Sequence, residues 1–156
     1  MSRLPWRYLV PVAVVGLLIA VFYQTTNGTG MISQRIGEAV HEPGARELDL
    51  PKLTSFGWDR FYFFKPGTSR EEICAFIGAP ANRCQLLVRY EAVPDDSNAL
   101  VFSLNGRLTH MELHALANGE FDFNAGPQGF AKETSVFRIR RSLSGVDQER
   151  IFLEPK

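Results

Sequence analysis

The chain has 156 residues, with 17 basic and 17 acidic side chains and therefore no formal net charge. A nucleic-acid-binding domain is expected to be clearly basic, so this balance argues against a nucleic-acid partner. The length suits one domain of ordinary size preceded by a short N-terminal segment.

That N-terminal segment is residues 8–23, YLVPVAVVGLLIAVFY, which contain no charged side chain. Sixteen residues lie just below the ~17–25 that usually cross a bilayer, but aromatic residues at both ends extend the segment, as interfacial belts do. Arg3 and Arg7 are the cations beside it, which places residues 1–7 in the cytoplasm. We predict a single-pass anchor in the bacterial inner membrane with an extracytoplasmic domain.

Two other interpretations of residues 8–23 remain open. A cleaved signal peptide has the same basic start and apolar centre but needs small residues before the cleavage site, and here Ala20 is followed by Val21, Phe22 and Tyr23. A buried core helix is the third interpretation.

Residues 24–57 are predicted to form a linker that carries a short juxtamembrane helix. Residues 24–30 are polar and glycine-rich, as in flexible tethers. Apolar residues then recur at helical spacing from Met31 to Val40, and Pro43-Gly44 ends the pattern. This helix either packs on its own domain or binds a partner, and the folded domain is expected over residues 58–156.

The start of that domain predicts a strand followed by a capped helix. Arg60 to Phe64 is aromatic and typical of a strand. Thr68 and Glu71 have the spacing of a capping box, which predicts a helix over residues 69–77 that buries Ile73, Phe76 and Ile77. Gly78 suits the left-handed position after a helix.

This segment, GWDRFYFFKPGTSREEICAFIG, resembles uncharacterised bacterial membrane-anchored proteins and lipoproteins with a Trp-Asp before a strand and a Glu-Glu-Ile helix. More loosely, PGTSREEICAFIGAP is similar to an element of the SmpA/OmlA-type small envelope lipoproteins. The second resemblance implies a role in envelope assembly, although this chain lacks a lipidated cysteine after its apolar segment.

Cys74 and Cys84 are the two cysteines. In an oxidising compartment an even pair in a small domain is usually a disulfide, which we predict here. Two buried thiols are the alternative.

The strongest strand signal is a hairpin with Asn105-Gly106 at its turn, a pair that tolerates both positive φ angles of a type I′ turn. We expect strands over residues 85–90, 99–104 and 107–116. If Leu104 faces Arg107, then Leu100 faces Met111, and one face is apolar, formed by Leu100, Phe102, Leu104, Met111 and Leu113. His110, Glu112 and His114 fall on the opposite face.

His110, Glu112 and His114 form a ligand-like pattern, because alternate residues of a strand point the same way. Neighbouring pairs of these side chains could share a zinc ion, but His110 and His114 lie about 13.6 Å apart on an extended strand, which is too far to converge readily. A solvated sheet face is the main interpretation, and a metal site is the alternative.

Residues 117–133 are predicted to form a long loop that carries Phe121, Phe123 and Phe130 among small and polar residues. Long loops are often functional, so these rings are candidate partner-binding residues, and the alternative is that they fold back on the sheet as a lid. Strands are expected again over residues 136–141, with Phe137 and Ile139 inward, and over residues 150–153.

Together these patterns predict an α+β fold: an N-terminal transmembrane helix, then a small antiparallel sheet with one or two helices on one face. The predicted function is a non-enzymatic, membrane-tethered protein-binding domain, acting as an accessory or scaffold subunit or as an inhibitor, without a cofactor. The alternative is a metal-binding module or metal-dependent hydrolase that uses His110, Glu112 and His114.

Overall fold

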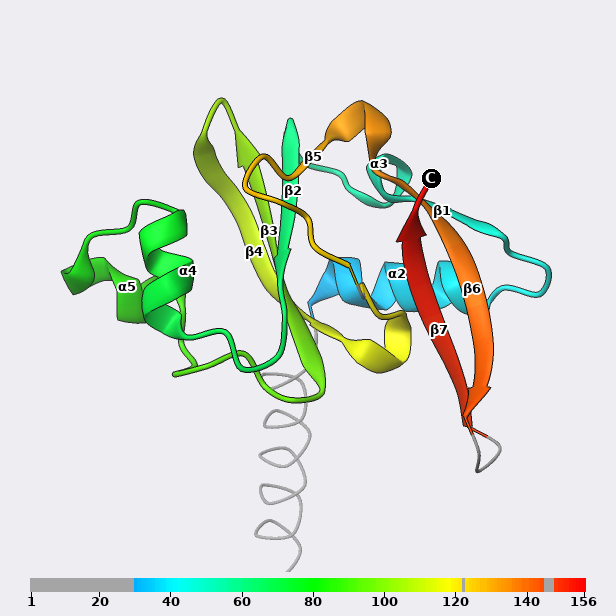
Figure 1. The fold of residues 1–156 in the computed structure, drawn as a ribbon. Coiled ribbons are helices and arrows are strands. Elements are labelled where there is room, and N and C mark those ends of the chain that lie inside the picture. Colours follow the sequence, from blue (N-terminus) through cyan, green and yellow to red (C-terminus); the bar gives the residue numbers. More distant parts are fainter. Residues whose placement is uncertain (1–29, 122, 145–147) are drawn as a thin grey trace, which may run out of the picture.

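The computed structural model describes residues 30–121, 123–144 and 148–156 and shows an α+β fold with two antiparallel sheets and a few helices (Figure 1). The helices of this part are α2 (Met31–His41), α3 (Leu50–Leu53), α4 (Arg70–Phe76), α5 (Ala81–Leu87) and the 3-10 turns η2 (Leu116–Asn118) and η3 (Lys132–Thr134). The strands are β1 (Glu47–Asp49), β2 (Arg60–Phe64), β3 (Ser97–Leu104), β4 (Arg107–Ala115), β5 (Phe130–Ala131), β6 (Val136–Ser144) and β7 (Gln148–Pro155).

The expectation of one sheet is corrected to two. Strands β4-β3-β2-β5 form a four-stranded sheet, and β1-β6-β7 form a three-stranded sheet. Phe61 of the first sheet and Phe137 of the second are both fully buried, with ring centroids 6.1 Å apart. Two sheets bury each other's apolar faces, whereas one wide sheet would need helices to cover the same area.

Helix α2 joins the two sheets and forms part of the core (Figure 1). At its start, the backbone N–H of Gly30 donates to the carbonyl of Leu113 in β4 at 3.0 Å. At its end, the guanidinium of Arg141 in β6 donates to the carbonyls of Val40 at 2.7 Å and Ala45 at 2.8 Å.

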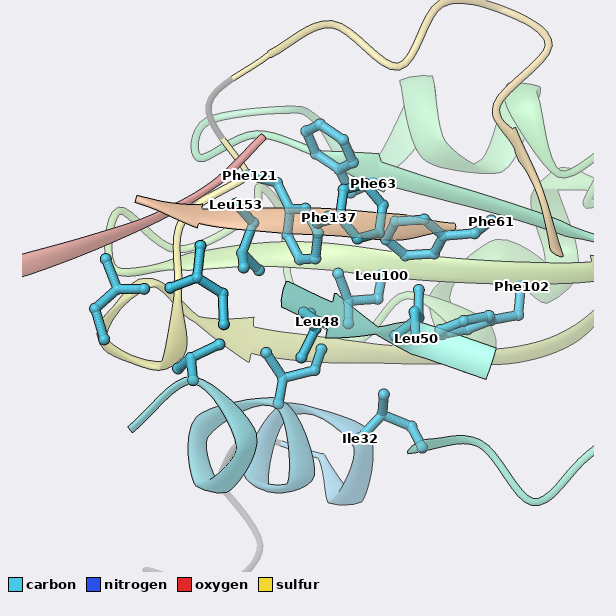
Figure 2. Packing of buried hydrophobic residues seen from close by; sticks show 14 of the residues in the cluster. Ile32, Leu48, Leu50, Phe61, Phe63, Leu100, Phe102, Phe121, Phe137 and Leu153 are labelled. Atoms are coloured by element: carbon cyan, nitrogen blue, oxygen red, sulfur yellow. The ribbon is translucent and has the colours of Figure 1, made fainter. Parts of the chain in front are cut away.

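The main core lies between the sheets and α2, and Figure 2 shows its apolar side chains converging from β2, β3, β6, β7 and α2. Leu48 of β1 and Leu50 of α3 are also buried in it. Residues 31–53, expected as a linker with a spacer helix, therefore belong to the folded domain itself.

The local predictions from residue 60 to residue 78 are close to the structure. Strand β2 has the predicted bounds, and Gly78 has the expected positive φ of 66°. The capping box lies one residue later than predicted: the N-cap is Ser69, whose hydroxyl accepts from the N–H of Glu72 at 3.2 Å. Phe76 was expected to be buried, but it is 42% exposed because α4 meets the sheet through Ile73 and Cys74.

The predicted strand over residues 85–90 is wrong. Residues 81–87 form α5, which starts directly after Pro80. Cys84 and Val88 are its buried residues, four positions apart as one face of a helix requires. β3, the next strand along the chain, is already paired on both sides, with β2 and β4.

The predicted membrane anchor, residues 8–23, lies outside the described residues. Among the residues that the structure describes, no helix has the length and apolar character needed to cross a membrane.

Candidate functional site

The hairpin turn is as predicted, but a β-bulge changes the faces of β4. Asn105 and Gly106 have positive φ angles of 52° and 73°, and Leu104 faces Arg107. Between Phe102 and Ser103 the register shifts by one residue, so that Phe102 faces His110 and Leu100 faces Glu112. A one-residue slip moves every following side chain to the other face of the sheet.

His110, Glu112 and His114 therefore point toward α2 and the main core, which corrects the predicted solvated face. His114 is fully buried, and the side chain of Glu112 is 7% exposed. The three residues lie along the line where β4 meets the start of α2.

The carboxylate of Glu112 caps α2. The N-cap residue of this helix is Gly30, which has no side chain to accept from the helix N–H groups. Oε1 of Glu112 accepts from the N–H of Ser33 at 2.7 Å, while Oε2 accepts from Nε2 of His110 at 2.7 Å. A Cβ atom at Gly30 would collide with the carboxylate of Glu112, so the close approach of this group depends on glycine at that position.

His114 is held as a neutral imidazole with a defined tautomer. Its Nε2–H donates to the carbonyl of Gly119 at 2.6 Å, which leaves Nδ1 as the acceptor for the hydroxyl of Ser33 at 3.0 Å. Burial lowers the pKa of His114 to about 4, although the Gly119 carbonyl and the charge of Glu112 act in the opposite direction.

Ser33 completes this network. Its hydroxyl donates to His114 and accepts from the N–H of Ala115 and from the side-chain amide of Asn118, both at 3.1 Å. The amide of Asn118 also donates to the carbonyl of Ser33 at 3.0 Å. Every hydrogen-bonding position of this hydroxyl is in use, so the network fixes α2 against β4.

The same contacts bear on the metal alternative. Both carboxylate oxygens of Glu112 and both ring nitrogens of His114 are engaged by groups of the protein itself. Within the described ranges no group of three His, Cys, Asp or Glu side chains is arranged to hold a metal ion. This arrangement suits a structural role, in which the hydrogen bonds hold α2 against β4, better than it suits a metal site.

The aromatic residues of the 117–133 segment lie against the core. Phe121 is 1% exposed and stacks on Phe63 with a centroid distance of 5.2 Å. Phe123 and Phe130 are partly buried and contact Phe137 at 5.9 and 5.5 Å. The geometry favours the lid interpretation of these rings, because Phe121 offers a partner almost no surface.

A surface hollow of about 670 Å³ lies between η2 and β7. The charges beside it satisfy one another, since Arg150 forms an ion pair with Glu120. Nε2 of His41 lies 3.3 Å from the carbonyl of Ala117. No buried polar atom without a partner is found among the described residues that line this hollow.

A different surface is formed by α4 and α5, which pack on the other face of the four-stranded sheet and which we call the α4–α5 hairpin (residues 70–88). A disulfide between Cys74 and Cys84 joins the two helices, with the Cα atoms 5.7 Å apart, which confirms the predicted pair. The buried residues of the hairpin and of the sheet face beneath it form a small separate core: Ile73, Cys74, Cys84, Val88, Val93 and Ala99.

Two leucines of α5 are exposed: Leu86 is 74% exposed and Leu87 is 43% exposed. Phe76 of α4 is 42% exposed, and its ring packs against Tyr62 and Phe64 of β2 at centroid distances of 4.7 and 5.1 Å. A groove of about 440 Å³ lies between α4 and α5 and is lined by small residues, the disulfide and a few polar residues: Ala75, Ala79, Ala81, Cys74, Cys84, Arg70, Glu71 and Gln85.

Sequence reasoning missed this surface because it assigned Leu86 and Leu87 to a strand over residues 85–90. One signal could have found it: Pro80 is well placed to start a helix, and Cys84 and Val88 then share a face that excludes Leu86. Comparison of the chain with protein-family models, curated protein sequences and solved structures finds no match.

Proposed function

We propose that this chain is a non-enzymatic protein-binding domain, tethered to the outer side of the inner membrane, and that the α4–α5 hairpin contacts its partner. The observation that carries this proposal is the exposure of Leu86 and Leu87 on a short helix that a disulfide locks in place. Single exposed leucines are common on protein surfaces, so the argument depends on their surroundings.

Those surroundings favour binding in two ways. The hairpin carries exposed leucines on α5 and, separately, a preformed groove between its two helices that is lined by small residues and the disulfide. The disulfide restricts the hairpin before any contact is made, which lowers the entropy lost on association.

The disulfide and the apolar segment at residues 8–23 support an extracytoplasmic location of the domain. Structural disulfides persist in oxidising compartments such as the bacterial periplasm. Arg3 and Arg7 before the apolar segment favour an orientation with the folded domain outside the cytoplasm. The resemblance to small envelope lipoproteins spans residues 66–80, which contain α4, so an envelope-assembly role would use the same hairpin.

The tether is tested by fractionating the full-length protein from its own membranes. We expect the intact chain to stay with the membranes after an alkaline carbonate wash. Recovery of a soluble product that begins near residue 29 would contradict the tether and favour a cleaved signal peptide.

The binding surface is tested with a photo-crosslinking residue at position 86 of the full-length chain in those membranes. The matched control is position 143, because Leu143 is 80% exposed on β6, on the opposite side of the molecule (Figure 1). We expect a protein adduct from position 86 and none from position 143. Equal labelling from both, or none from position 86, would contradict the proposed binding surface.

A further inference from the structure

We propose that a hollow on the four-stranded sheet binds a small organic acid, in which a carboxylate is carried on an aromatic ring or a short apolar chain. The hollow lies on the sheet face that carries the α4–α5 hairpin, and we call it the sheet hollow. The two helices leave part of this face uncovered, because the turn end of β3 and β4 extends beyond them (Figure 1). This inference is independent of the proposed protein-binding function.

The size and the walls of the sheet hollow suit the apolar body of such a ligand. Its volume is about 250 Å³, whereas a dry cavity of about 150 Å³ is enough to hold a benzene molecule. Its apolar side chains come from four elements, with Tyr62 on β2, Val101 on β3, Leu108 on β4 and Phe76 on α4. A single ring or a short chain therefore fits and buries apolar surface.

The aromatic wall of the sheet hollow is formed before a ligand enters. The ring of Tyr62 meets the ring of Phe76 edge to face, with the centroids 4.7 Å apart. The backbone of Gly129 packs so closely against the ring of Tyr62 that a Cβ atom there would collide with it. A wall that is already ordered loses little conformational freedom on binding.

A buried hydroxyl group marks the polar end of the site. Ser103 lines the sheet hollow and is only 8% exposed, and its Oγ has no hydrogen-bond partner in the part of the chain that the structure describes. A buried hydroxyl without a partner destabilises a fold, and a ligand that bonds to it would remove that cost. Serine side chains rotate among three staggered positions, so the hydroxyl can turn toward a ligand.

Arg60 supplies the charge that selects an acid. It pairs with Ser103 across β2 and β3, so the two side chains are neighbours on one face of the sheet. The guanidinium of Arg60 is exposed, without a hydrogen-bond or ion-pair partner among the described residues, and none of the residues described along the sheet hollow is acidic. An arginine and a hydroxyl donor side by side match the two oxygens of a carboxylate.

Titration with benzoate tests the site, with the amide NMR signals of the full-length protein in detergent micelles as the readout. We expect saturable shifts at Tyr62, Val101, Ser103 and Leu108. Benzyl alcohol has the ring without the carboxylate, and acetate has the carboxylate without the ring, so each should bind at least about fivefold more weakly. The absence of saturable shifts at these residues, or equal binding of benzyl alcohol, would overturn the proposal.

Two substitutions test the polar end of the site. We expect Arg60→Gln and Ser103→Ala each to weaken benzoate binding about fivefold. The matched control is Arg138→Gln on β6, because Arg138 is also exposed and has no partner among the described residues. It should leave the affinity unchanged. Full affinity in either test variant, or an equal loss in the control, would contradict the assigned roles.

The stability of Ser103→Ala separates a binding role from a structural one. Without ligand this variant should melt at the wild-type temperature or above it, because the substitution removes the hydroxyl that lacks a partner. A lower melting temperature would show that the hydroxyl stabilises the fold, and its assignment to a ligand would then be wrong.

Discussion

The backbone N–H of Ser33 donates a 2.7 Å hydrogen bond to the carboxylate of Glu112, 79 positions later in the chain. This contact places a negative charge at the start of α2, and Arg141 places a positive charge at its end. Both charges interact favourably with the helix dipole and so stabilise α2. Because Glu112 lies on β4 and Arg141 on β6, the same two contacts hold α2 to both sheets.

Replacing Glu112 by Ala should lower the free energy of unfolding by about 1–2 kcal/mol, the usual cost of losing an N-cap acceptor. The reason is that the N–H of Ser33 then lies partly buried without an acceptor. Urea denaturation of the full-length protein measures the change. The control Glu133→Ala, at an exposed carboxylate, should alter it by less than about 0.5 kcal/mol; equal effects would contradict the capping role.

Replacing Arg141 by Met keeps the aliphatic stem and removes the donors to Val40 and Ala45. We expect a loss of about 1 kcal/mol, since the guanidinium is partly exposed and water can replace part of the contact. The two ends of α2 lie about 16 Å apart, so the effects of Arg141→Met and Glu112→Ala should add. A clear departure from additivity would show that the two contacts are coupled.

Acid should destabilise the protein through His114. Its pKa is about 4 in the folded protein and 6.5 in an unfolded chain, so between these values the unfolded state binds a proton that the folded state does not. The free energy of unfolding therefore falls as the pH drops from 6.5 toward 4, by up to about 3 kcal/mol, and is unaffected by this group above 6.5.

This contribution is measured by denaturation at several pH values across that window. His114→Gln removes the titrating group and should flatten the dependence on pH, whatever its effect on stability at neutral pH. The control His41→Gln, at an exposed side chain, should keep the wild-type slope. A steep slope that persists in His114→Gln would assign the acid sensitivity to other groups.

Phe121→Ala should cost about 3–5 kcal/mol, as for other buried aromatic residues, because Phe121 is 1% exposed and packs against Phe63 and Phe137. Thermal melting measures this loss, and Leu143→Ala, at an exposed position, is the control. An unchanged melting temperature in Phe121→Ala would restore these rings as candidates for partner binding.

Removing the disulfide should loosen the α4–α5 hairpin before the rest of the domain. Replacing Cys74 and Cys84 by Ala opens a loop of ten residues, which costs about 2.5–3 kcal/mol in the chain-entropy model. Hydrogen exchange should accelerate in residues 70–88, while α2 and β4 stay protected. Uniform acceleration through the chain would show that the hairpin and the main core unfold together.

Local signals in the sequence determined several elements correctly. The aromatic run of β2, the helix period of α2, the Asn105-Gly106 turn and the glycine after α4 each depend on backbone preferences within a few residues. The pairing of Cys74 with Cys84 followed from their number and short separation. For these features the interactions between near neighbours are sufficient.

Tertiary structure alone decided where the polar residues of β4 point. The bulge after Phe102 has no signature in the sequence, yet it moves His110, Glu112 and His114 from the expected outer face to the inner one. The inward side chains contact Ser33, 79 positions before Glu112, and Gly119, just beyond the end of β4. Side chains of a regular strand alternate between two faces, so a bulge of one residue reverses the faces that follow it. When the contacts that favour the bulge come from another element, the pattern of the strand itself does not show it.

The same holds for α5 and for the division into two sheets. Residues 85–90 alternate well enough for a strand, but β3 already has strands on both sides, and the disulfide holds Cys84 beside α4. β6 pairs with β1, nearly ninety positions earlier, because their apolar faces share the core with α2. Sequence patterns indicated the apolar faces of strands such as β2 and β6, and the packing of apolar faces against each other decided which strands pair.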